Sequence, residues 1–185
     1  MGRSSPSLDF SELKTFLDEK AELYNRSDFI ETDPIQVAHQ FSQEADIEIA
    51  AFLSASLAWG QKSTIINNSS KLLSWMPGGP HEFILNADDR DLNRFLPFVH
   101  RTFNGIDCIY FLKALRNIYQ HHGGLRQVFE SDYALHGDLF LSLISFREKF
   151  FELSPPGRTA KHLANPEKGS SAKRLNIYMR VIKAA

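Results

Sequence analysis

One segment, residues 46–58, constrains the fold of this chain more than any other part of the sequence. Between its large apolar side chains lie small ones that cover most of the remaining circumference of a helix: Ala50, Ala51, Ser54, Ala55, Ser56 and Ala58. A helix that is apolar or small on nearly every side is buried, because small side chains let other helices approach closely. The segment therefore predicts a central helix that is capped by Asp46 and ended by Gly60.

Helical periodicity extends through most of the remaining sequence. Apolar residues spaced three or four positions apart predict helices or shorter helical pieces over residues 10–24, 34–41, 63–75, 82–85, 91–96, 104–119, 125–129 and 138–153. No stretch alternates with period two for long enough to predict a strand. We therefore expect an all-α fold, built as one compact multi-helix domain.

Composition is that of an ordinary soluble domain with a substantial core. Fifteen phenylalanines among the 185 residues predict a core filled by large rings, and the single cysteine, Cys108, excludes an internal disulfide framework. Residues 1–7 lack the apolar stretch of a signal peptide, and the longest apolar run, residues 49–60, is too short to cross a bilayer. We expect a cytoplasmic monomer with no cofactor, no metal and no membrane contact.

Charge is distributed unevenly along the chain. Residues 158–185 hold seven basic residues and one acidic residue, a net charge of +6, whereas the whole chain carries −1 and residues 1–157 therefore about −7. The asymmetry predicts a polyanionic partner for the C-terminal end, and nucleic acid is the obvious candidate. We expect an all-helical body over residues 1–157 and a basic hairpin-plus-helix segment over residues 158–185 that packs on it within a single domain.

The basic segment contains a Pro/Gly/Ser-rich turn followed by a helix. The proline, glycine and two serines of residues 166–171 predict a tight turn with a serine N-cap, and Lys173 and Arg174 fall in the first helical turn. Backbone N–H groups at the start of a helix point outward beside its positive dipole end, which favours a bound phosphate. The segment therefore predicts a phosphate-binding hairpin.

Lys173 has two interpretations. A lysine in the first turn of a helix is ordinarily a solvated charge or a phosphate contact. The neighbouring Arg174 and the helix dipole also disfavour the ammonium form, which is how an enzyme prepares a lysine to act as a nucleophile. The residues alone leave both interpretations open.

Other polar or aromatic residues offer weaker candidates. Arg101, beside a turn between two predicted helices, either contacts a phosphate or binds helix-end carbonyls. Adjacent residues of a helix diverge by about 100°, so His121 and His122 favour a helix C-cap over a metal pair. Trp59 and Trp75 are typical of a core or an interface between helices rather than of base stacking. The sequence contains no P-loop, nucleophile elbow, dinucleotide fingerprint or His-Glu-x-x-His motif.

Residues 46–61, 100–103 and 166–180 resemble an uncharacterised bacterial family that is distantly similar to the helix-hairpin-helix DNA glycosylases, and the resemblance covers nearly the whole chain. In those glycosylases a Gly-x-Gly-x-Lys hairpin joins two helices, binds DNA phosphates through backbone N–H groups and places a catalytic lysine. Here the stretch Gly169-Ser170-Ser171-Ala172-Lys173 lies at the corresponding place. Ser171 replaces the second glycine, and residues 166–168 lengthen the turn.

The resemblance implies a helix-hairpin-helix glycosylase-like architecture and a DNA-binding protein of base-excision repair. Its mechanism would be base flipping, attack of neutral Lys173 on the sugar C1′ and Schiff-base formation. The residues expected to hold the DNA phosphates are Arg101, Lys168, Gly169, Ser170, Ser171, Arg174 and Arg180.

One departure from the glycosylase pattern is larger than the others. Such enzymes carry, after the hairpin, a Pro-x-Asp-x-His segment whose aspartate stabilises the developing sugar cation, and residues 174–185 contain no acidic residue. We therefore expect a truncated form of an incomplete fold, which binds DNA without turnover. The alternative is a non-catalytic helical interaction domain whose basic end binds an acidic protein or RNA. In the first case Lys173 faces a cleft, near Arg101 or an aromatic ring, and in the second it points away from any concavity.

Overall fold

The computed structural model describes residues 9–24 and 33–184. The chain divides into two compact units, residues 1–33 and residues 34–185, and each is considered by itself. The first unit contains helix α1 (Phe10–Tyr24), which confirms the predicted first helix. Its expected end at Asn25 lies outside the described residues. The larger apolar side chains of α1 are exposed, with Phe10, Phe16 and Leu17 each more than half accessible to solvent.

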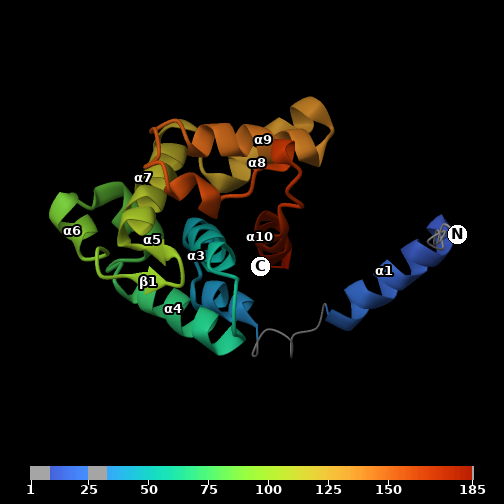
Figure 1. Cartoon of the computed structure of the whole chain (residues 1–185), viewed down its shortest axis with the longest axis horizontal. Helices are drawn as coiled ribbons and strands as arrows, with labels where there is room; N and C mark the ends of the chain where they lie inside the picture. The colour runs from blue at the N-terminus through green and yellow to red at the C-terminus, as the bar shows by residue number, and fades with distance from the viewer. Residues whose placement is uncertain (1–8, 25–32, 185) are drawn as a thin grey trace, which may run out of the picture. The chain divides into compact units, whose positions relative to one another are not determined.

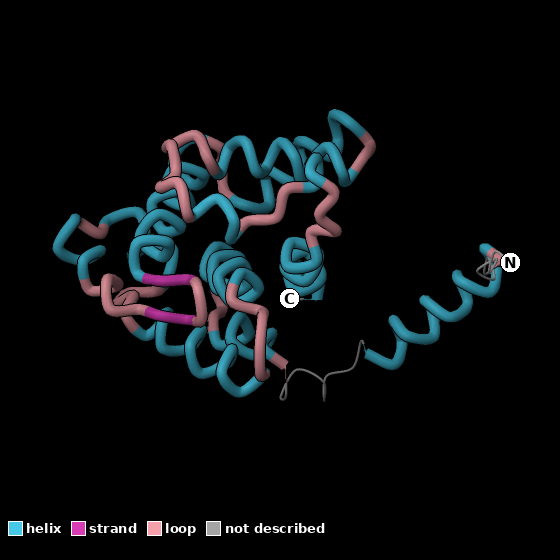
Figure 2. The backbone as a smooth tube through the Cα atoms, in the orientation of Figure 1, coloured by secondary structure: helices cyan, strands magenta, loops and turns pink. Residues whose placement is uncertain are grey.

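The regular secondary structure of the second unit is almost entirely helical, which confirms the all-α fold (Figure 1; Figure 2). Two 2-residue strands pair antiparallel in a small hairpin, with Val99 opposite Asn104. In chain order the elements, with 3-10 helices labelled η, are η1 (Pro34–Gln40), α3 (Glu44–Ser56), α4 (Lys62–Ser74), α5 (Pro80–Asn86), α6 (Asp89–Asn93), β1 (Val99–His100), β2 (Phe103–Asn104), α7 (Gly105–His121), α8 (Leu125–His136), α9 (Leu139–Phe150), η2 (Thr159–His162), η3 (Pro166–Lys168) and α10 (Lys173–Ala184).

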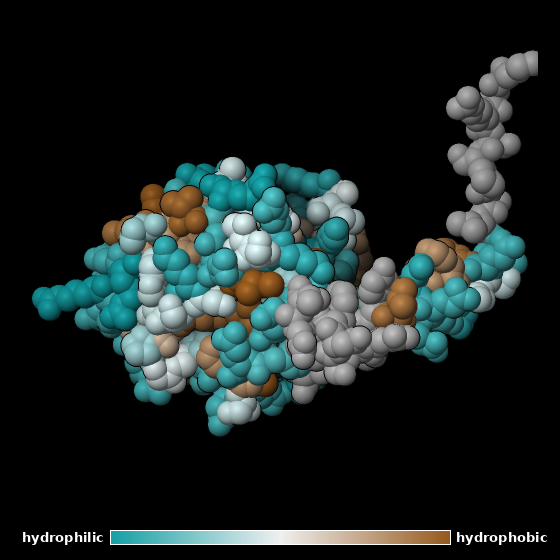
Figure 3. Space-filling view, turned by 90° about the horizontal axis from the view of Figure 1, so that it is seen from below, coloured by the Kyte–Doolittle hydropathy of each residue, from teal (hydrophilic) through white to brown (hydrophobic). Residues whose placement is uncertain are grey.

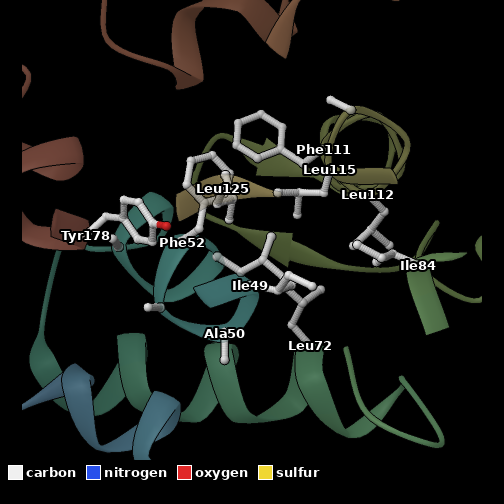
Figure 4. Close-up of a cluster of buried hydrophobic side chains, with 14 of the residues drawn as sticks. Ile49, Ala50, Phe52, Leu72, Ile84, Phe111, Leu112, Leu115, Leu125 and Tyr178 are labelled. Atoms are coloured by element: carbon white, nitrogen blue, oxygen red, sulfur yellow. The ribbon is translucent and has the colours of Figure 1, made fainter. Parts of the chain in front are cut away.

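Helix α3 is the predicted central helix. Residues 48–56 are all buried, and α3 packs against η1, α4, α5, α8 and α10. Figure 4 shows side chains from several of these helices meeting around Ile49 and Phe52. The small residues of α3 make this possible, because they allow neighbours on more than one side.

The predicted ends of α3 are wrong. The helix begins at Glu44 and ends at Ser56, so Asp46 lies in its first turn. The Asp46 carboxylate instead accepts the backbone N–H of His81, at 2.7 Å, in the first turn of α5. Asp46 therefore satisfies a free N–H of another helix, a contact between residues 35 positions apart that local sequence rules do not foresee.

Aromatic rings fill the core, as the phenylalanine content predicts. The Phe52 ring of α3 lies 5.7 Å from that of Phe146 in α9, 5.5 Å from Phe150 and 5.7 Å from Tyr178 in α10, measured between centroids. Tyr178 is fully buried. Burial of one such side chain contributes about 1.5–3 kcal/mol, so α10 is anchored to the core although its opposite face is basic.

Helix boundaries follow side-chain caps where the sequence offers them. Asn104 and Asp107 form a capping box at the start of α7, and Asp138 caps α9, so both helices begin close to the starts predicted at residues 104 and 138. Helix α8 is longer than the one or two turns expected, and its second half carries the buried Asp132, which pairs with Lys149 of α9 at 2.9 Å. The prediction of a single domain divided near residue 157 stays a prediction.

Candidate functional site

A pocket of about 730 Å³ lies where the C-terminal segment meets the body of the second unit. The residues that line it are Ala58, Trp59, Arg147, Ala160, Lys161, Leu163, Ala164, Asn165, Lys168, Gly169, Ser170, Ser171, Lys173 and Arg174. Five of these are basic and none is acidic. We call it the basic pocket. It brings together six of the eight residues predicted to form the site, Arg101 and Arg180 being the exceptions.

The hairpin that forms one wall is fixed by local hydrogen bonds. The Asn165 carbonyl accepts the N–H of Lys168 and of Ser170, both at 3.2 Å, and Gly169 adopts a left-handed conformation with φ +79°. Such a φ favours glycine, because a Cβ is disfavoured there. Asn165, the residue before the turn, therefore holds the turn in place through its carbonyl.

The serine N-cap prediction is wrong, because α10 begins at Lys173 and the residue before it is Ala172. Ala172 has φ +50° and is buried, and its N–H donates to the Ser170 hydroxyl at 3.2 Å. The first backbone bond of the helix runs from the N–H of Asn176 to the carbonyl of Ala172. Helix geometry consequently leaves the N–H groups of residues 173–175 without a partner inside the helix.

Lys173 is exposed at the rim of the basic pocket. Among the described residues no carboxylate pairs with its ammonium group. Lys173 is the first residue of α10, and the half-buried Trp59 lines the same pocket. Lys173 is thus free to contact a ligand, and an aromatic ring shares its pocket.

Arg174 is held by the protein. Its Nη1 donates to the carbonyl of Ser56, the last residue of α3, at 3.0 Å, and its guanidinium carbon lies 4.9 Å from the centre of the Trp59 ring. A cation at the C-terminal end of a helix is favoured by the helix dipole. Burial lowers the pKa of Arg174 from its usual value. Arg174 therefore ties the start of α10 to α3 and so sets the position of Lys173.

Trp59 is confirmed as a residue packed between elements. Its ring stacks on His100 with centroids 6.3 Å apart, and it meets the His162 ring in an edge-on arrangement with centroids 5.7 Å apart. The His100 Nδ1 accepts from the Asn68 amide at 2.8 Å, so its Nε2 carries the proton and faces the Trp59 carbonyl at 3.3 Å. Burial lowers the pKa of His100, and the imidazole is a neutral part of the wall.

A buried polar cluster lies behind this wall, centred on Asp107. This carboxylate is fully buried and accepts from the Thr159 hydroxyl at 2.8 Å and from the Asn104 N–H at 3.0 Å. The Arg158 Nη2 lies 3.3 Å and the His162 Nε2 3.2 Å from the same carboxylate. Three residues of the segment 158–162 thus contact one side chain of α7. These contacts fix the position of the segment, and with it the position of Lys161 at the basic pocket.

His162 is not hydrogen-bonded despite its closeness to Asp107, because neither ring nitrogen has a partner in suitable geometry. Burial lowers the pKa of His162, and the negative charge of Asp107 opposes that shift only in part. Its ring makes edge contacts with Trp59 and Phe103. A neutral His162 therefore serves as packing between the wall and the core.

Arg101 and Arg180 lie outside the basic pocket. Arg101 occupies the turn between β1 and β2 with φ +55°, is exposed and extends alongside Gly60, the residue after Trp59. No helix-end carbonyl accepts from it among the described residues. Arg180 is exposed on α10. The structure places Arg101 near the pocket and leaves Arg180 further along the helix.

The predicted role of His122 near the end of a helix is structural. His122 follows the last residue of α7 and its Nε2 lies 2.9 Å from the Glu152 carboxylate. Nowhere in residues 9–24 and 33–184 do three or more His, Cys, Asp or Glu side chains gather as a metal site. A second pocket, of about 570 Å³, contains Glu48, Tyr119 and Arg126 together with four further carboxylates, so its charge is opposite to that of the basic pocket.

Residues 33–182 match the model of a protein family described as DUF2400, protein of unknown function. The chain belongs to this family. The DUF2400 segment contains every residue that lines the basic pocket, whereas α1 lies outside it. Comparison with curated proteins and with solved structures gives no match. In the described part of the chain, no helix combines the length and the apolar character that crossing a membrane requires.

Proposed function

We propose that this protein binds DNA through the basic pocket and is glycosylase-like in architecture. The observation that carries the proposal is the pocket itself, in which five basic side chains from separate parts of the chain meet without any carboxylate. Unpaired cations held close together repel one another, so such a pocket is favoured when a polyanion neutralises it. The backbone N–H groups at the start of α10 add donors that suit phosphate oxygens.

The backbone of Gly169 supports the proposed match to a Gly-x-Gly-x-Lys hairpin, whereas the backbone of the residues after it differs from that pattern. Gly169 has the positive φ that a glycine in such a hairpin supplies, whereas Ser171 does not have a positive φ. The left-handed residue is instead Ala172. A second glycine is therefore not required at residue 171, and the replacement by serine is compatible with a phosphate-binding turn.

The proposed chemistry is carried by Lys173. In a form that excises bases, its amine would attack the sugar C1′, and the bond from C1′ to the base would break with its electron pair leaving on the base. The nitrogen lone pair would then expel O4′ from C1′, O4′ would take the proton that the amine gives up, and a Schiff base to the opened sugar would remain. No carboxylate lines the pocket to stabilise the developing sugar cation. We therefore propose that this chain binds DNA but does not excise bases.

An abasic site tests Lys173 without base excision. The ring-opened abasic sugar is an aldehyde, so a lysine amine condenses with it, water leaves, and borohydride delivers hydride to the imine to form a permanent cross-link. We expect the wild-type chain to cross-link to abasic duplex DNA and the Lys173→Gln variant not to do so. The Lys168→Gln variant, which changes the same pocket but keeps Lys173, should still cross-link.

Two results would contradict this chemistry. Absence of a wild-type adduct on abasic DNA would remove the lyase proposal, and an undiminished adduct in Lys173→Gln would show that another lysine reacts. Glutamine has a helix propensity close to that of lysine, so the variant should remain folded. Circular dichroism of each variant is the control for folding.

The alternative function is a non-catalytic interaction domain for an acidic protein or RNA. It is favoured by apolar side chains exposed near the turn between α8 and α9, namely Tyr133, Leu135, Leu139, Phe140 and Leu141. The face of the second unit seen in Figure 3 is mostly hydrophilic and carries several hydrophobic patches. Competition by RNA of the same sequence as the DNA distinguishes the two, because a glycosylase-like protein should prefer the DNA duplex.

A further inference from the structure

The cations of the basic pocket come from three separate parts of the fold. Arg147 lies on α9, Lys161 on η2, and the hairpin with the start of α10 supplies Lys168, Lys173 and Arg174. A hairpin alone presents its donors to one side of a phosphate. Here the donors belong to three separate parts of the fold that line one pocket, so they suit a group that offers acceptors to more than one of these parts.

Arg147 is the least satisfied of these cations. Its Nε is buried without a hydrogen-bond partner, and its guanidinium carbon lies 4.6 Å from the centre of the Phe151 ring. A buried N–H without an acceptor is unfavourable. An oxygen atom brought into the pocket by a ligand is the kind of partner that this group lacks.

We propose that the basic pocket binds a terminal phosphate of a nucleic-acid strand, a phosphomonoester, in preference to an internal phosphodiester. This inference rests on the proposed function and names the part of the nucleic acid that the site recognises. A phosphomonoester carries a charge of about −1.5 to −2 at pH 7 and three strong acceptor oxygens. An internal phosphodiester carries one negative charge and two free oxygens, and its flanking sugars block approach from two sides.

The remaining lining suits the nucleoside attached to such a phosphate. Ala58, Ala160, Leu163 and Ala164 supply small apolar surface beside the half-buried Trp59. Both Arg174 and His100 already lie against the Trp59 ring. The terminal nucleoside is therefore expected to contact an apolar wall rather than to stack on the indole.

Fluorescence anisotropy with one labelled single-stranded DNA tests the inference. The same strand is prepared with a 5′-phosphate, with a 3′-phosphate, and with hydroxyl groups at both ends, the label being attached internally. We expect one phosphorylated strand to bind at least about 10-fold more tightly than the hydroxyl strand, a difference of about 1.4 kcal/mol. Arg147→Gln and Lys161→Gln should each reduce this ratio, whereas Lys71→Gln, an exposed lysine on α4, should leave it unchanged.

The outcomes separate this inference from the proposed function. Salt-dependent binding with equal affinity for all three strands would overturn the terminal-phosphate inference and leave DNA binding intact. Direct binding of adenosine 5′-monophosphate, measured by calorimetry, together with no binding of any strand, would support a phosphomonoester pocket and overturn the nucleic-acid function. Failure to bind any strand or the mononucleotide would overturn both.

Discussion

Replacement of Asp107 by alanine is expected to destabilise the second unit and to loosen the segment 158–162, which contains Lys161. The variant removes the acceptor of the buried Thr159 hydroxyl and of the Asn104 N–H. Each buried donor left without an acceptor costs about 1–3 kcal/mol. The Arg158 side chain is 44% exposed, so its contact with Asp107 adds only about 0–1 kcal/mol.

Together these losses give about 3 kcal/mol for Asp107→Ala, counting each of the two donors at about 1.5 kcal/mol, in the lower half of the range, because the Asn104 N–H is only partly buried. For a unit of this size each kcal/mol lowers the melting temperature by about 2–4 °C, so the fall should be about 6–12 °C. Urea unfolding followed by far-ultraviolet circular dichroism measures the free energy directly. Asp89→Asn is the control, because Asp89 is 88% exposed and its contact with Lys113 is long, at 3.3 Å.

A double-mutant cycle decides whether the cluster acts as one unit. Thr159→Val removes only the hydroxyl that Asp107 accepts, and should cost about 1 kcal/mol. The combined variant should lose less than the sum of the two single variants by at least about 0.5 kcal/mol. A loss below about 1 kcal/mol in Asp107→Ala, or additive losses in the cycle, would refute the role given to this carboxylate.

Two further predictions concern protonation and backbone shape. The pKa of His162 in the folded state is below its usual 6.5, so the unfolded chain binds the proton more readily and stability is lost as the pH falls through 6.5. The melting temperature should therefore fall less between pH 7.5 and pH 5.5 in His162→Phe than in wild type, and equal falls would contradict a buried neutral imidazole. Gly105→Ala should unfold the unit or destabilise it by several kcal/mol, because a Cβ there overlaps the backbone of Leu96. Gly169→Ala, with φ +79° but open space around it, should cost only about 1–2 kcal/mol, and the reverse order in urea unfolding would contradict the close packing of Gly105 against Leu96.

Local patterns predicted most of the helices because their causes lie within a few residues. The capping box of Asn104 with Asp107 and the cap at Asp138 belong to this class. The wrong assignments have distant causes. Asp46 satisfies α5 rather than its own helix, and the part of α8 beyond the predicted turns pairs with α9 through Asp132 and Lys149.

The candidate site was predictable only where it is contiguous in sequence. The hairpin and Lys173 stand out from the composition of residues 166–174. Arg147 and Trp59 reach the same pocket from α9 and from the end of α3, and no sequence spacing signals that meeting. The buried polar cluster next to the pocket joins Asp107 to Thr159, 52 residues away. This contact also depends on how the helices pack.

The central claim is that the basic pocket binds nucleic-acid phosphates, and the salt dependence of DNA affinity tests it most directly. The logarithm of the binding constant should fall linearly with the logarithm of salt concentration, with a slope of about −0.9 for each phosphate neutralised on a duplex. Replacing Lys161 and Lys168 together by glutamine should reduce the magnitude of the slope by about 2, whereas Lys71→Gln should leave it unchanged. A salt-independent affinity, or a slope that the double replacement does not alter, would contradict the account.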